Sequence, residues 1–150
     1  MDRALLAVGL VLIAVMVATV LRRRGADAPS QGPSWATPTQ LDRSDFDRPD
    51  APWLVVVFSS ATCLSCGAVW TKAGHLRSDV VAVQEVEAVA ARDLHQRYGV
   101  EAVPMVLVAD STGAVRASFL GEPTATDLWA AVAELREPGS TPAECDHGVI

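Results

Sequence analysis

This 150-residue sequence has little of what stabilises small secreted proteins or binds nucleic acids. Its three cysteines are too few for a scaffold held together by disulfides. Basic residues are scarce beyond the amino-terminal region, because eight Lys and Arg against seventeen Asp and Glu follow residue 24, a net charge of −9. A domain of that charge repels a phosphate backbone, which argues against nucleic-acid binding.

The chain also lacks the short motifs of several enzyme classes. It contains no G-x-S-x-G, no P-loop and no H-E-x-x-H, so hydrolytic and nucleotide-dependent functions have no support. The sequence indicates no cofactor. His75 and His95 have no carboxylate or nucleophile placed to act with them, and we expect both side chains at the surface.

A long uncharged segment stands near the amino terminus. Ala4 to Leu21 is eighteen residues without a charge, about 27 Å as a helix against the ~30 Å of a bilayer core. We therefore predict a single transmembrane anchor at residues 4–21. A cleaved signal peptide is the alternative, since Ala26-Asp27-Ala28 resembles a cleavage site.

The next residues predict how the rest of the chain is tethered. Residues 22–39 form a basic flank, Arg22 to Arg24, and then a linker rich in Ala, Pro, Ser and Gly. Positive charge tends to stay in the cytoplasm, so the arginines favour a cytoplasmic domain at the cell membrane, and an extracytoplasmic domain stays open. We expect a compact domain at residues 40–137 and a flexible tail at 138–150.

Within the domain, the apolar pattern predicts alternating strands and helices. We expect strands at residues 53–58, 80–86, 103–109 and 115–120, and helices at 63–77 and 88–98. Thr124, with Asp127 three residues later, resembles a capping box that starts a last helix, which Pro138 ends. The order predicts an α/β fold, a mixed sheet flanked by helices.

The sequence Cys63-Leu64-Ser65-Cys66 follows a buried strand and is expected to open a helix. The free N–H groups and positive dipole of a helix N-terminus favour a thiolate on Cys63. Cys66 lies about one turn further along and could resolve a mixed disulfide formed on Cys63. A structural disulfide is one alternative. A zinc site is another, completed by Cys145 and His147, although no second pair with metal-ligand spacing is present.

Several stretches together resemble the thioredoxin superfamily, in particular its membrane-anchored bacterial members. The resemblance covers about residues 39–135. The stretches that carry it are Phe58 to Cys66, Arg97 to Pro104, Asp110 to Gly113, and Phe119 to Gly121, with Asp42 to Phe46 similar to the family's entry into its first helix.

This resemblance implies a thioredoxin-like fold and a role for each residue of the site. Cys63 would be the attacking cysteine and Cys66 the resolving one. Pro104 would be the family's cis-proline beside the disulfide, with the main chain of Val103 pairing with an extended substrate segment. Leu64 and Ser65, between the cysteines, would tune the redox preference and meet the substrate.

The chain departs from the family's general reductants at several positions. Leu64-Ser65 replaces Gly-Pro between the cysteines, and Thr62 replaces the Trp that precedes the first cysteine. Val57 stands where the family has a buried Asp that handles the proton of the resolving thiol. These changes indicate a narrower partner range or a different redox direction.

Two functions follow from these observations. The first is a membrane-tethered thiol–disulfide oxidoreductase that acts on protein thiols and disulfides and exchanges electrons with a partner reductase or oxidase. The second is a non-catalytic adaptor or redox sensor with the same fold, which the absence of an acid at Val57 favours. Cys145 could be a third redox thiol or a passive one.

Overall fold

A computed structural model describes residues 36–140 of the chain. The elements alternate much as the apolar pattern predicts. They are η1 (Arg43–Asp45), β1 (Trp53–Ser59), α2 (Cys66–Gly74), β2 (Val81–Glu87), α3 (Arg92–Arg97), β3 (Met105–Ala109), β4 (Val115–Leu120) and α4 (Ala125–Arg136). The predicted anchor at residues 4–21, most of the linker, Cys145 and His147 lie outside the described residues. Among residues 36–140 there is no helix with the length and apolar character to cross a bilayer.

The four strands form one mixed sheet in the order β2-β1-β3-β4. β1 runs parallel to β2, antiparallel β3 lies on its other side, and β4 pairs antiparallel with β3. A crossover through α2 joins the parallel pair, whereas the tight turn after β3 joins the antiparallel hairpin, as chain connectivity requires. The predicted mixed α/β sheet is therefore confirmed.

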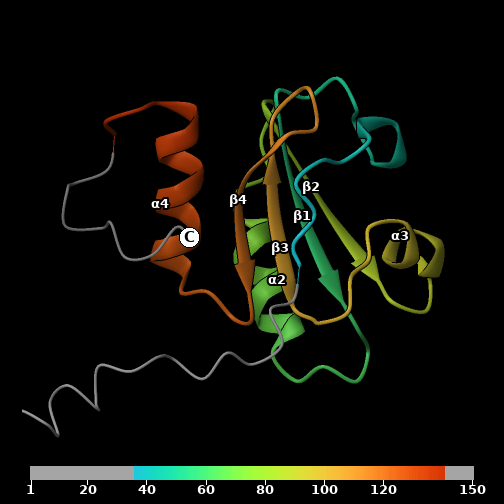
Figure 1. The fold of residues 1–150 in the computed structure, drawn as a ribbon. Helices are drawn as coiled ribbons and strands as arrows, with labels where there is room; N and C mark the ends of the chain where they lie inside the picture. Colours follow the sequence, from blue (N-terminus) through green and yellow to red (C-terminus); the bar gives the residue numbers. More distant parts are fainter. Residues whose placement is uncertain (1–35, 141–150) are drawn as a thin grey trace, which may run out of the picture. The chain divides into compact units, whose positions relative to one another are not determined.

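Helices cover both faces of the sheet (Figure 1). α2 and α4 pack on one face, and α3 with residues 41–46 packs on the other. Because side chains alternate along a strand, β1 contributes Val55 and Val57 to the α2 face and Leu54, Val56 and Phe58 to the α3 face. All but the first residue of β1 are buried, as expected for a strand covered on both sides.

Tyr98 holds residues 42–45 against the face of the sheet that α3 covers. Its hydroxyl donates to Asp45 Oδ2 at 2.5 Å and accepts from the Asp42 N–H at 3.0 Å. Burial, followed by this bond to Asp45, raises the pKa of Tyr98 to about 12. The phenol therefore stays neutral and donates throughout the physiological pH range.

The start of α4 has the expected cap. The Thr124 hydroxyl accepts from the Asp127 N–H at 3.1 Å, which satisfies one of the free donors of the first turn. The Asp127 carboxylate accepts from that hydroxyl at 2.7 Å, whereas a capping box would place it on the Thr124 N–H. The helix ends at Arg136, just before the predicted stop at Pro138.

Two predicted helices are shorter in the structure. The helix expected from residue 63 begins at Cys66, because a turn closed by the Cys63 N–H on the Ser60 carbonyl at 3.0 Å is followed by a second turn at Leu64 and Ser65. The helix expected at residues 88–98 is reduced to α3. The Glu87 carboxylate there accepts from the N–H groups of Val89 and Ala90 and holds them in a turn.

Candidate functional site

Cys63 and Cys66 form a disulfide at the end of the sheet where β1 stops. The two sulfurs are 2.09 Å apart, and the Cα atoms are 5.5 Å apart. Cys66 is the first residue of α2 and is 3% exposed, whereas Cys63 precedes the helix and is half-buried. The prediction that Cys63 itself opens the helix is wrong. Cys63 is nonetheless the more accessible of the two cysteines.

The loop before β3 comes to the same end of the sheet. Met105 is the register partner of Phe58, so Pro104 lies level with the last residues of β1. The Val103–Pro104 peptide bond is cis, which confirms that expectation. β3 begins at Met105, two residues later than predicted, because residues 103 and 104 form a bend. The Pro104 carbonyl accepts from the Gly121 N–H at 2.8 Å, which fixes this loop against the end of β4.

The two residues between the cysteines differ in their surroundings. The Leu64 side chain is 103% exposed, so it packs against nothing in the described part of the chain. The Ser65 hydroxyl lies 3.9 Å from Cys63 Sγ. A hydroxyl at that position can donate to a thiolate when the disulfide is reduced. Leu64 thus offers an apolar contact to a partner, and Ser65 contacts the sulfur itself.

Val57, at the position of the family's buried acid, is fully buried and packs in the apolar layer under α2. Its register partner on β2 is Glu85, which sequence reasoning missed. Val81 and Val83 pack on the α2 face, so Glu85, two residues further, projects from that face as well. Its carboxylate accepts from the buried Ser59 hydroxyl at 2.7 Å.

Glu87, at the end of β2, is a second residue of the site that the sequence did not reveal. One carboxylate oxygen accepts from the Ala61 N–H at 3.2 Å, and the other accepts from Val89 N–H at 2.9 Å and Ala90 N–H at 2.8 Å. These bonds, that to Ala90 first, lower the pKa of Glu87. Glu87 therefore joins the segment leading to Cys63 to the turn before α3.

The two histidines occupy different environments. His75 is exposed and caps the end of α2, as expected. His95 is half-buried, its Nε2 lies 2.9 Å from the Val86 carbonyl, and its ring meets Phe58 edge-on. The expectation of a surface His95 is therefore wrong, because α3 packs this residue against the sheet. Within residues 36–140 there is no cluster of three metal-ligating side chains.

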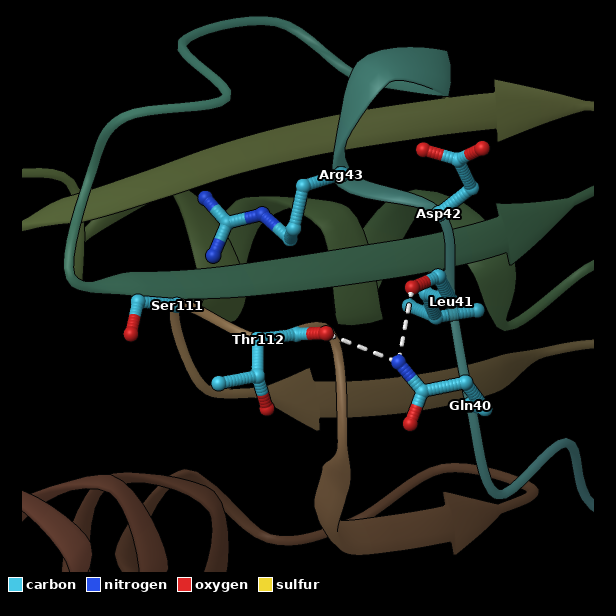
Figure 2. A pocket seen from close by; sticks show the side chains of 6 residues that line it. All are labelled: Gln40, Leu41, Asp42, Arg43, Ser111 and Thr112. Atoms are coloured by element: carbon cyan, nitrogen blue, oxygen red, sulfur yellow. Dashed lines mark hydrogen bonds between the residues drawn. The ribbon is translucent and has the colours of Figure 1, made fainter.

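A separate hollow of about 460 Å³ lies at the other end of β3 (Figure 2). The Gln40 side chain lines this hollow, and its amide donates to the Thr112 carbonyl at 2.8 Å. Arg43 is buried beside it, and burial lowers the pKa of its guanidinium. That guanidinium donates to the carbonyls of Asp110, Ala51 and Arg48. These bonds join residues 40–43 to the turn between β3 and β4 and to the loop before β1, so we assign the hollow a structural role.

Comparison with known proteins supports the fold. No protein-family model matches the chain, and no curated protein matches it. A solved structure of a point mutant of thioredoxin from Halobacterium salinarum NRC-1 aligns with TM-score 0.52 and 20% identity, over 67% of this chain and 93% of that one. A structure described as that of a malarial protein aligns with TM-score 0.51 and 16% identity, over 55% of this chain and 96% of that one.

These similarities establish a thioredoxin-like fold for this chain. In this fold the Cys63–Cys66 disulfide, at C-x-x-C spacing, follows the end of β1.

Proposed function

We propose that this chain is a membrane-tethered thiol–disulfide oxidoreductase that acts on partner proteins through Cys63 and Cys66. The observation that carries the proposal is the unequal exposure of the two bonded sulfurs. Cys63 is half-buried and Cys66 is 3% exposed, on a thioredoxin-like fold. A more accessible attacking cysteine and a shielded resolving cysteine suit sequential thiol–disulfide exchange, because the rate of attack depends on access to the sulfur.

The proposed reaction transfers two electrons without a further group. In the reduced protein, the Cys63 thiolate attacks one sulfur of a partner disulfide and expels the other sulfur as a thiolate, which takes a proton. The Cys66 thiolate then attacks Cys63 Sγ, restores the intramolecular disulfide and releases the second partner thiol. The partner is reduced and the pair is oxidised, and the reverse sequence oxidises a partner dithiol.

Three residues at this end of the sheet are suited to holding the partner. Residues 36–140 supply no hydrogen bond to the main chain of Val103, which leaves its N–H and carbonyl for an added extended segment. Pro104 restricts the main chain of that loop at the end of the sheet where β1 leads to Cys63. Leu64 offers an exposed apolar contact. We propose that these residues recognise the polypeptide around the reacting cysteine.

The membrane tether rests on the sequence alone. Eighteen uncharged residues at 4–21 followed by three arginines favour a single-pass anchor with the domain on the cytoplasmic side. Tethering would confine the domain to partners at or near the bilayer. Fusion of a reporter enzyme to residue 150 of the full chain tests the orientation, because activity on only one side of the membrane assigns it.

Substitution of the resolving cysteine tests the oxidoreductase. In a full chain with Cys66→Ser, attack by Cys63 should accumulate mixed disulfides with partners, seen as adducts that a reductant dissolves. Cys63→Ser is the matched control and should trap nothing. Both variants should also carry Cys145→Ala, so that the third thiol cannot contribute. Equal trapping by the two variants would contradict the assigned roles.

A non-catalytic adaptor is the second candidate, and the buried Val57 favours it, since no acid lies at that position. An adaptor would bind its partners with either cysteine replaced and would form no adducts. Equilibration of the wild-type pair with glutathione separates the two functions. If the cysteine pair never exchanges with glutathione, the result favours the adaptor. A measurable equilibrium constant supports the enzyme.

A further inference from the structure

Two carboxylates on β2 contact residues 59–63, which run from the last residue of β1 to the first cysteine and are called the redox segment below. Glu85 accepts from the Ser59 hydroxyl, and Glu87 accepts from the Ala61 N–H. The main chain adds a third link, because the Ala88 N–H donates to the Ser59 carbonyl at 2.9 Å. The redox segment is thus joined to β2 at Ser59 and at Ala61, and carboxylates make two of the three links.

The contact from Glu87 is the one nearest to Cys63 in the chain. Ala61 and Cys63 are two residues apart, a span of at most about 7 Å. The turn from Cys63 N–H to the Ser60 carbonyl folds that span back on itself. The Glu87 carboxylate therefore lies on the order of 10 Å from the Cys63 sulfur, which is about one Debye length at 0.1 M salt.

The Glu87 carboxylate is fixed and ionised at neutral pH. Three main-chain N–H groups from two segments hold it, and their bonds lower its pKa. A carboxylate held in this way cannot turn away from a charge that develops nearby. Since Ala61 N–H donates to Glu87, this donor is also occupied and is not available to a thiolate.

We propose that Glu87 is a positioning residue that disfavours the Cys63 thiolate and so makes the cysteine pair a stronger reductant. The inference rests on the proposed oxidoreductase function and adds a redox direction to it. A redox pair becomes a strong oxidant when its reduced form is stabilised. A fixed negative charge beside the attacking sulfur does the opposite, because it destabilises the reduced thiolate form.

The basic side chains of α2 and α3 nearest to this region have partners of their own. Lys72 of α2 is ion-paired with Glu122, and His95 of α3 binds the Val86 carbonyl, although its proximity contributes to the low pKa of Glu87. Glu85 adds a second negative charge on the same strand. The charged side chains with hydrogen bonds to the redox segment are therefore both carboxylates in the described part of the chain.

The test compares two charge-neutralising variants in the full chain, purified in mild detergent. Glu87→Gln keeps an oxygen that can accept from the loop and removes the charge. Asp79→Asn is the matched control, because it removes one exposed charge beyond the opposite end of β2. Asp79 therefore lies about 25 Å from Glu87, since a strand rises by ~3.3 Å per residue. The readouts are the equilibrium constant with glutathione and the rate of Cys63 alkylation by iodoacetamide between pH 5 and 9.

For Glu87→Gln we expect the glutathione equilibrium to shift about threefold toward the dithiol, and Cys63 alkylation at pH 7 to become about threefold faster. These values correspond to about half a pKa unit for one partly screened charge. Asp79→Asn should change neither readout. Glu87→Asp, which keeps the charge, should return both readouts toward wild type, and this rescue separates a charge effect from a loss of structure.

The outcomes separate this inference from the function on which it rests. If wild type exchanges with glutathione and Glu87→Gln matches Asp79→Asn, the role of Glu87 is overturned and the oxidoreductase stands. If Glu87→Gln slows alkylation or shifts the equilibrium toward the disulfide, the sign is wrong and the inference fails. If wild type does not exchange at all, the proposed function fails first.

Discussion

Asp110, at the turn between β3 and β4, offers a prediction that links stability to pH. Its Oδ1 accepts from the Thr112 N–H at 2.8 Å, the Thr112 hydroxyl at 2.6 Å and the Ala114 N–H at 3.2 Å, and Oδ2 accepts from Arg116 Nε at 2.7 Å. These bonds, that from the Thr112 hydroxyl first, lower the pKa of Asp110 from 3.8 to about 2. Asp110→Asn removes the charge and one strong acceptor.

The size of the effect follows from this shift. A difference of nearly two pKa units corresponds to about 2.4 kcal/mol at most. The Arg116 partner is 54% exposed and solvent screens the pair, so we expect Asp110→Asn to lower the free energy of unfolding by about 1–2 kcal/mol at pH 7. The folded-state pKa lies below the unfolded one, so this stability is present above pH ~4 and is lost as pH falls through ~2.

Urea unfolding followed by tryptophan fluorescence measures the effect. Wild type and Asp110→Asn should be compared in the full chain at pH 7, 4 and 2. Asp79→Asn, an exposed carboxylate at the other edge of the sheet, is the control for loss of one negative charge. The difference from wild type should shrink steadily below pH 4. A difference that is the same at pH 7 and pH 2, or absent at pH 7, would refute the reasoning.

Four further substitutions, at three positions, test how the turns and caps stabilise the fold. Gly113→Ala should destabilise the fold by more than about 2 kcal/mol, because a Cβ there would lie 1.9 Å from the Leu41 carbonyl oxygen at φ +82°. Gly139→Ala, at φ +84° with open space around it, should cost only the ~1 kcal/mol of the backbone conformation. Thr124→Ala should lower the free energy of unfolding by about 1 kcal/mol through loss of the α4 cap, and Thr124→Ser should recover most of it. Denaturant midpoints measure the stability of all four variants. Equal losses of stability for the two glycine variants would contradict the predicted clash at Gly113.

The fold could be predicted from the sequence because its strands carry strong local signals. The run from Trp53 to Phe58 is apolar and β-branched throughout, and the structure buries all of it except the half-buried Trp53. The cis bond before Pro104 was expected from the resemblance alone, since no local property of the residues distinguishes a cis from a trans proline.

Helix boundaries were predicted less well, because contacts distant in sequence set them. The turn before α2 and the Glu87 bonds to Val89 and Ala90 remove the first residues of two predicted helices. Local helix preference is weak compared with such tertiary bonds. The half-buried position of His95 likewise depends on α3 packing against Phe58, a contact between residues far apart in the chain.

The sequence by itself determined the mixed α/β fold and the candidate redox pair, because apolar periodicity and cysteine spacing are local properties. The membrane anchor and the side of the membrane stay predictions from the same local pattern. Only the tertiary structure decided which sulfur is shielded and that Glu85 and Glu87 lie beside the redox segment. The physical reason is the parallel register of β1 and β2, which brings together residues more than twenty positions apart.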